Sequence, residues 1–368
     1  EGSRTIYIDP YKRGKAVHDA DMILITHAHY DHFDESSLRN VAGDDTFVVN
    51  TVDQLLSAIE AGKEEITLAA GSYDLGGVLT VSAPLTLKGQ PGAEITGAFK
   101  LSGEVGTFSL DGLTVLAGGQ GNFIELDNSE GVSASEVTVR NTVIDGFSKS
   151  VIYASNTADK FKVDDILFSG VEIKNHGTGQ GVLDLRNGAY GTFTLEESTV
   201  TGGRDFLRID APCSITAVYV RNNTLNNLND SANAGGVLCV RATPTTYIVS
   251  NNIFANILNS ISGRTAAMKP VMKRNVWYNI GDKFYTGCID ADLAVDGSGV
   301  LLSADPFRDA ASGDYTLTNA VVMSLGAGAS KWNPAIATVS DGDSFTVSSV
   351  EEFQAAVDAG KSDIRFAA

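Results

Sequence analysis

The sequence has few of the residues that mark several large classes of protein. Only 3 of its 368 residues are cysteine and no two of them form CxxC, so neither a disulfide framework nor a zinc-finger pattern is expected. No run of 18 or more apolar residues occurs, so no membrane span is expected. Lys and Arg number 27 against 45 Asp and Glu, a net charge of −18, which argues against nucleic acid and anionic membrane surfaces as partners.

What the sequence does have is a repeat among many turn-forming residues, including 38 glycines. A six-residue segment that begins and ends apolar and is mostly polar between recurs with steps of 29, 29, 27, 25, 29 and 23 residues. The copies begin at Leu110, Val139, Phe168, Leu195, Val220, Val249 and Met272. A coil of about 25 residues with three short strands explains such a period, whereas no helical repeat does.

A second segment advances in step with the first, and it alternates like a strand. Its third and fifth residues are apolar, while its fourth and sixth are mostly polar and are expected to face outward. The fourth-position column is Glu125, Tyr153, Asp184, Arg208 and Cys239, and the sixth-position column is Asp127, Ser155, Arg186, Asp210 and Arg241. Together the two segments predict an all-β fold, a single-stranded right-handed parallel β-helix, over residues 45–332.

Two local signals accompany the coil. Thr51 and Gln54 form a capping box before an amphipathic stretch that ends at Gly62, which predicts a short helix covering the open end of the first coil. The pairs Asn222-Asn223 and Asn251-Asn252 recur at 29 residues and predict a stacked asparagine ladder.

The coil region resembles the secreted right-handed β-helix proteins of the pectate-lyase-like and chondroitinase-B-like superfamily. The resemblance covers about 290 residues and includes the segments 47–55 and 304–317. It implies a polysaccharide or other glycan as partner and an extracellular, cell-surface or periplasmic location.

The outward columns supply the candidate site. Stacked strands lie about 4.8 Å apart, so the carboxylates of Asp184 and Asp210 are expected one coil apart on the same face as Arg208. These three residues are the candidate catalytic residues. The candidate substrate-binding residues are Tyr153, Arg186, Arg204, Asp205 and Arg241. Three interpretations stay open: a solvated salt-bridge ladder, a sugar-binding face whose arginines grip uronate or sulfate, and a lyase or hydrolase face acting on acidic glycans. Ca²⁺ could assist on the β-helix, and Asp290 and Asp292 with Asp296 are one candidate site, the alternative being a plain turn.

The N-terminal residues 1–44 look foreign to the coil. The motif His27-x-His29-x-Asp31-His32 follows an apolar stretch, and it resembles the metallo-β-lactamase superfamily. The resemblance implies that these four residues bind metal, with Zn²⁺ as the expected ion. After residue 50 only His176 remains as a further histidine, so the ligand set of that family is incomplete in this sequence. The alternatives are a metal-dependent hydrolase, adventitious metal binding and a non-catalytic remnant.

Residues 333–368 are expected to begin a second copy of the coil. At an offset of 298 positions, residues 343–368 match residues 45–70 at eleven of 26 positions, without a gap. This repeat favours an alternative function, in which the chain is a non-enzymatic structural or adhesin-type unit of a surface protein.

Overall fold

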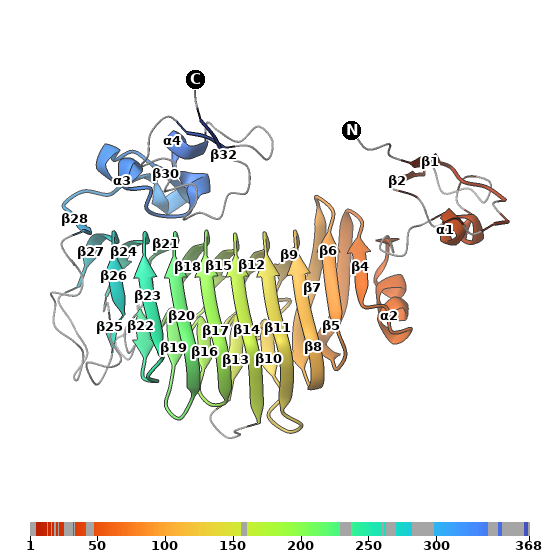
Figure 1. Cartoon of the computed structure of the whole chain (residues 1–368), viewed down its shortest axis with the longest axis horizontal. Helices are drawn as coiled ribbons and strands as arrows, with labels where there is room; N and C mark the ends of the chain where they lie inside the picture. Colours follow the sequence, from red (N-terminus) through yellow and green to blue (C-terminus); the bar gives the residue numbers. More distant parts are fainter. Residues whose placement is uncertain are drawn as a thin grey trace.

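The protein folds as the predicted parallel β-helix, seen in the computed structural model of Figure 1. The structure describes residues 5–12, 14–15, 17, 20, 22–25, 32, 34–41, 48–155, 160–228, 237–258, 261–262, 270–281, 298–337, 345–347 and 364–366. Each coil contributes one strand to each of three faces, and each strand pairs in parallel with the equivalent strand of the next coil. Among the described helices, none is long and apolar enough to cross a membrane.

Face 1 is a ten-stranded parallel sheet. Its strands are β3 (Val48–Val49), β4 (Glu65–Leu68), β6 (Leu85–Gly89), β8 (Gly103–Asp111), β11 (Val132–Arg140), β14 (Phe161–Ser169), β17 (Ala189–Glu196), β20 (Ser214–Arg221), β23 (Thr246–Ser250) and β26 (Val271–Lys273). The first repeat segment of the sequence begins near the end of these strands and continues onto face 2.

Faces 2 and 3 join into one 16-stranded sheet, because β5 (Gly71–Val81) and β7 (Ala93–Leu101) run through both. Face 2 holds β9 (Thr114–Leu116), β12 (Val143–Asp145), β15 (Glu172–His176), β18 (Thr199–Gly202), β21 (Thr224–Asn226), β24 (Ile253–Ile257), β27 (Val276–Ile280) and β28 (Val300–Leu302). Face 3 holds β10 (Ile124–Leu126), β13 (Ile152–Ala154), β16 (Leu183–Leu185), β19 (Leu207–Ile209), β22 (Leu238–Val240) and β25 (Ile261–Ser262).

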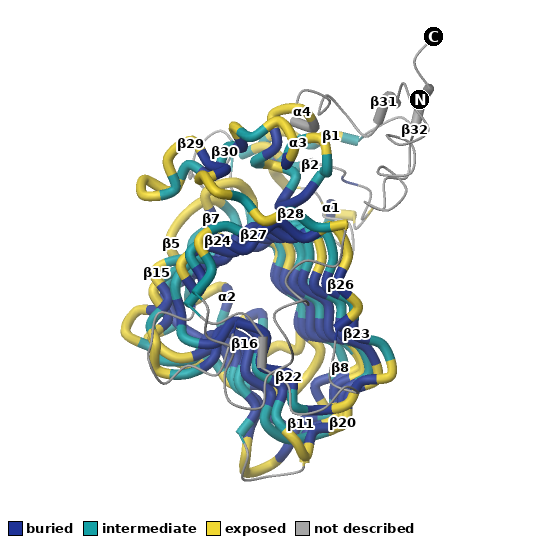
Figure 2. Tube along the Cα trace, turned by 90° about the vertical axis from the view of Figure 1, so that its left-hand side faces the viewer, coloured by how far each residue is buried: buried dark blue, intermediate teal, exposed yellow. Residues whose placement is uncertain are grey.

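The core fills the inside of the coil. Leu183, Leu207 and Leu238 are register neighbours in successive coils, and all three are completely buried. Viewed along the coil in Figure 2, buried residues recur along the strands of all three faces. Because each coil stacks directly on the one before, residues some 25 to 30 apart in sequence become neighbours.

The asparagine ladder is confirmed at the turn between faces 1 and 2. Asn223, Asn252 and Asn275 are almost completely buried, and each Nδ2 of the first two donates to the Oδ1 of the next, at 2.9 and 3.0 Å. Asn222 and Asn251 precede them with φ of +56°, a left-handed conformation that asparagine tolerates better than most residues.

The predicted capping helix is α2 (Val52–Glu60). The Thr51 side chain accepts from the Gln54 amide, and the chain leaves the helix through Gly62 at φ +73°. Leu55 and Ala58 are buried in the core, so this helix closes the open end of the first coil.

The strand after β4 is a long one, because β5 begins at Gly71 and runs to Val81. The register passes from Asp74↔Thr96 to Val78↔Ala98, so β5 bulges outward at this point. This bulge lets one continuous strand turn the corner between faces 2 and 3.

A C-terminal segment packs on the outside of face 2. It comprises β29 (Phe307–Asp309), η3 (Ala310–Ser312), β30 (Asp314–Leu317), α3 (Ala320–Leu325), η4 (Ser330–Trp332) and α4 (Pro334–Ala337). In Figure 1 it lies alongside β21, β24 and β27. Phe307, Leu317 and Val322 bury the outward side chains of Ile253 and Val276, which explains why face 2 carries apolar residues on both sides here.

The two terminal regions contain short elements. The N-terminal region has β1 (Ile6–Ile8) paired in parallel with β2 (Met22–Leu24), followed by α1 (Glu35–Val41). Near the C-terminus, β31 (Phe345–Val347) pairs in parallel with β32 (Ile364–Phe366). The backbone register there is that of β3 with β4, shifted by 298 positions. The second copy stays a prediction.

Candidate functional site

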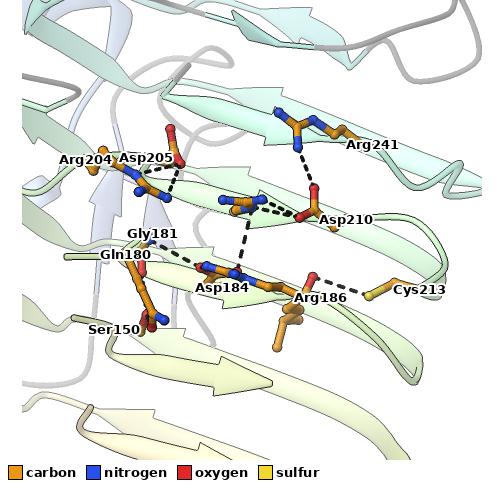
Figure 3. A network of polar contacts seen from close by, with 12 residues as sticks. Ser150, Gln180, Gly181, Asp184, Arg186, Arg204, Asp205, Asp210, Cys213 and Arg241 are labelled. Atoms are coloured by element: carbon orange, nitrogen blue, oxygen red, sulfur yellow. Dashed lines mark hydrogen bonds and ion pairs between the residues drawn. The ribbon is translucent and has the colours of Figure 1, made fainter. Parts of the chain in front are cut away.

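The fourth-position column of the sequence forms a continuous row on face 3. The register pairs are Glu125↔Tyr153, Tyr153↔Asp184, Asp184↔Arg208 and Arg208↔Cys239. Side chains of the sixth position reach back toward this row. Figure 3 shows Asp184, Arg186, Asp210 and Arg241 close together. With Arg208, which contacts both aspartates, they form the cluster called here the arginine–aspartate network.

Asp184 lies at the centre of the network and is completely buried. Arg186 holds its carboxylate with two hydrogen bonds, from Nε at 2.9 Å and from Nη2 at 2.8 Å. The Gly181 amide donates at 3.3 Å and Arg208 Nε lies 4.0 Å away. A Cβ on Gly181 would stand 3.2 Å from the Cβ of Arg208, so this close approach of the chain favours glycine.

Asp210 joins the next two coils. Its Oδ2 accepts from Arg208 Nε at 2.8 Å and Nη2 at 2.7 Å, and its Oδ1 accepts from Arg241 Nη1 at 2.9 Å. Arg208 thus lies between the two carboxylates. Such charge-assisted bonds fix the orientation of the guanidinium planes. The N–H groups that do not bond the two aspartates keep their donor capacity.

The network carries three arginines and two aspartates, a sum of +1, in a chain whose net charge is −18. The guanidinium side chains of Arg186, Arg208 and Arg241 are 17%, 20% and 21% exposed. The hydrogen bond to Asp184 raises the pKa of Arg186. Burial acts to lower the pKa of Arg208, but its bonds to Asp210 and its attraction to Asp184 raise it overall.

The other predicted substrate-binding residues surround this network. Tyr153 has the Arg186 guanidinium 5.6 Å from its ring centre, a cation–π arrangement. Arg204 and Asp205 contact each other at 3.3 Å just before β19. Asp205 is only 2% exposed, so it lies beneath the surface, whereas the Arg204 side chain reaches the surface.

His176 lies on face 2, at the end of β15. Its side chain is 93% buried, Nδ1 donates to the Gly177 carbonyl at 2.6 Å, and Nε2 has no hydrogen-bond partner among the described residues. Burial lowers the pKa of His176 to about 4. The histidine is therefore neutral at neutral pH and is part of the packing around the turn.

The predicted metal ligands lie mostly outside the described part of the chain. His27, His29 and Asp31 are among the residues that the structure does not describe, as are Asp290 and Asp292. His32 is described, and its Nδ1 lies 2.9 Å from Asp9 Oδ2. Among the described residues no three His, Cys, Asp or Glu side chains form a group that could hold a metal ion.

Comparison with known proteins found few similarities. No family model matches the chain. Over 122 residues, 32% of this chain, it is 32% identical to a UPF0173 metal-dependent hydrolase of Methanosphaerula palustris, and the match spans 54% of that protein. The chain thus spans about half the length of the curated relative it matches.

Two solved structures are also similar to the chain. One is the PL6-family alginate lyase AlyGC, with a TM-score of 0.26, and the other is a single-substitution variant of that lyase, with a TM-score of 0.25. In both cases the identity is 13%, covering 87% of this chain and 64% of the lyase chain. Scores of this size carry no inference about function.

Proposed function

We propose that the chain is a carbohydrate-binding β-helix protein that holds an acidic glycan on the arginine–aspartate network. The observation that carries the proposal is the set of three partly exposed guanidinium groups on one face, locally positive in an acidic chain. An extracellular, cell-surface or periplasmic location is part of the same proposal.

The network is prepared for binding because Asp184 and Asp210 hold the arginines in place. Arginine loses little conformational freedom on binding when its plane is already fixed, and its fork matches carboxylate and sulfate groups. A uronate or sulfated sugar resting on Arg208 and Arg241 would meet donors that are already oriented. The overall negative charge of the chain then restricts anion binding to this face.

The geometry supports binding better than cleavage. A lyase needs a group that removes a proton, and the raised pKa values of Arg186 and Arg208 keep both protonated. Asp184 is completely buried, so it supports the arginines rather than touching a ligand. Ca²⁺ would need carboxylate oxygens that Asp184 and Asp210 already give to arginines. Catalytic roles for Asp184, Arg208 and Asp210 stay a narrower hypothesis.

Replacing Arg208 with glutamine should weaken the binding of a polyuronate hexasaccharide about 10- to 100-fold, the range for losing one charge-assisted contact. Isothermal titration at two salt concentrations measures it, and absorbance of the unsaturated product tests for lyase activity in the same samples. Arg221→Gln is the matched control, because Arg221 pairs with Glu196 on face 1. Equal affinities of wild type and Arg208→Gln, or no binding of uronate or sulfated glycans at all, would favour the structural or adhesin-type alternative.

A second candidate function is metal-dependent hydrolysis by the N-terminal motif, favoured by the likeness to the UPF0173 metal-dependent hydrolase. His27, His29, Asp31 and His32 would bind Zn²⁺ in this proposal. Metal analysis of the purified chain, with phosphodiester and lactam substrates, tests it. Stoichiometric zinc and turnover that disappear in His27→Ala would support it, and metal-free inactive protein would exclude it.

A further inference from the structure

A shallow trough opens near the first coils, beside the start of the fourth-position row. It consists of two hollows of about 360 and 220 Å³ that share Gln120. Asp74 and Gly97 line the first hollow, and Glu125 and Lys149 line the second. Their combined size is within the range of sites for small ligands, about 300–1,000 Å³.

The trough exists because backbone replaces side chains at the bulge of β5. Four of the residues lining the first hollow are glycines, namely Gly76, Gly77, Gly97 and Gly118. A Cβ on Gly97 would come within 2.6 Å of the Gly77 carbonyl oxygen, so the floor admits no larger residue there. The hollow therefore offers peptide groups and a few polar side chains rather than an apolar cavity.

The charge of the trough differs from that of the network. Asp74, Glu125 and Lys149 sum to −1, and none of the three forms an ion pair within the described part of the chain. The Gly76 amide donates to Asp74, and Asn122 donates to Glu125, so both carboxylates keep accepting capacity. An acidic sugar would be repelled here, whereas hydroxyl groups could donate to these oxygens.

The second hollow also has an apolar side. Val78 lines it and is 51% exposed, one of the most exposed large apolar side chains of the coil. Sugar rings carry C–H faces as well as hydroxyl groups. A surface with one exposed aliphatic side chain among carboxylate, amide and ammonium groups complements an uncharged sugar on both counts.

We propose that the trough binds uncharged sugar residues, so that the glycan held by this protein combines neutral residues in the trough with acidic residues on the arginine–aspartate network. The second half of this statement rests on the proposed function. Glu125 and Arg208 are three register steps apart, about 14 Å, so one oligosaccharide could reach both.

Hydrogen–deuterium exchange and titration with cellohexaose, mannohexaose and xylohexaose test the trough. At least one of these neutral probes should bind and should protect residues 74–78 and 118–122. Gly76→Asn should weaken that binding at least tenfold, because the new side chain enters the trough. Asparagine tolerates the φ of +67° at this position, and nothing lies within 4 Å of the new Cβ.

Gly326→Asn is the matched control, with a φ of +63° and open space at a distant turn. Arg208→Gln should leave neutral binding unchanged, while Gly76→Asn should leave the binding of a short polyuronate unchanged. Absence of binding by all three neutral probes, or neutral binding that survives in Gly76→Asn, would overturn the trough proposal. If the neutral probes bind as expected but the wild-type protein binds no polyuronate, only the proposed function is overturned.

Discussion

Asp184→Ala should lower the free energy of unfolding by about 3–5 kcal/mol, the range for removing one partner of a buried ion pair. The wild-type carboxylate is completely buried and takes two bonds from Arg186 and one from the Gly181 amide. Without it, Arg186 and Arg208 would face each other with no negative charge between them. Urea unfolding followed by circular dichroism measures the change.

Glu196→Ala is the control for this prediction, since Glu196 also pairs with an arginine of the next coil. That pair is exposed, with Arg221 at 45%, so its loss should cost at most about 1 kcal/mol. Similar losses in the two variants would show that the network is an ordinary surface salt-bridge ladder. A large difference would show that Asp184 organises the arginines from below.

Asn252→Ala should destabilise the fold by about 3 kcal/mol or more, although it removes no apolar contact of the core. Its Nδ2 donates to the Val220 carbonyl and to Asn275, and its Oδ1 accepts from the amide and side chain of Asn223. Alanine would leave these groups without partners in a buried turn, at about 1–3 kcal/mol for each unsatisfied group. The same urea unfolding experiment measures the loss.

Asn187→Ala provides the comparison, because Asn187 is only half-buried and its side chain accepts a single bond, from the Gly188 amide. A loss of at most about 1 kcal/mol is expected there. If Asn252→Ala were equally mild, the buried ladder would contribute little to holding successive coils together. Hydrogen exchange of the Asn223 amide would then also be unchanged.

The arrangement of the network could be predicted from the sequence because the coil has a regular period. Alternation within the second repeat places Asp184 and Arg208 in one column, and the register confirms it. The ladder of Asn223 and Asn252 follows from the same spacing. In each case a local pattern of a few residues, repeated every coil, specifies a contact between distant positions.

The burial of Asp184 could not be predicted, because alternation assigns it to the outer side of its strand. It is buried by Arg186 and by the close passage of Gly181, both of which depend on loop geometry. The packing of Phe307 and Val322 on face 2 was missed for a related reason, since no repeat connects that segment to the coil. The trough depends on the bulge in β5, a strand that lies before the first copy of the repeat.

Distances between spin labels on one outward column of face 1 test the stacking of the coils most directly. In a background with the three cysteines replaced by serine, labels at positions 88 and 221 are five register steps apart, and labels at 88 and 273 are seven. Electron–electron double resonance should give about 24 and 34 Å, an increase of about 4.8 Å for each coil. Distances that do not grow with the number of coils between the labels would contradict the β-helix and every site built on it.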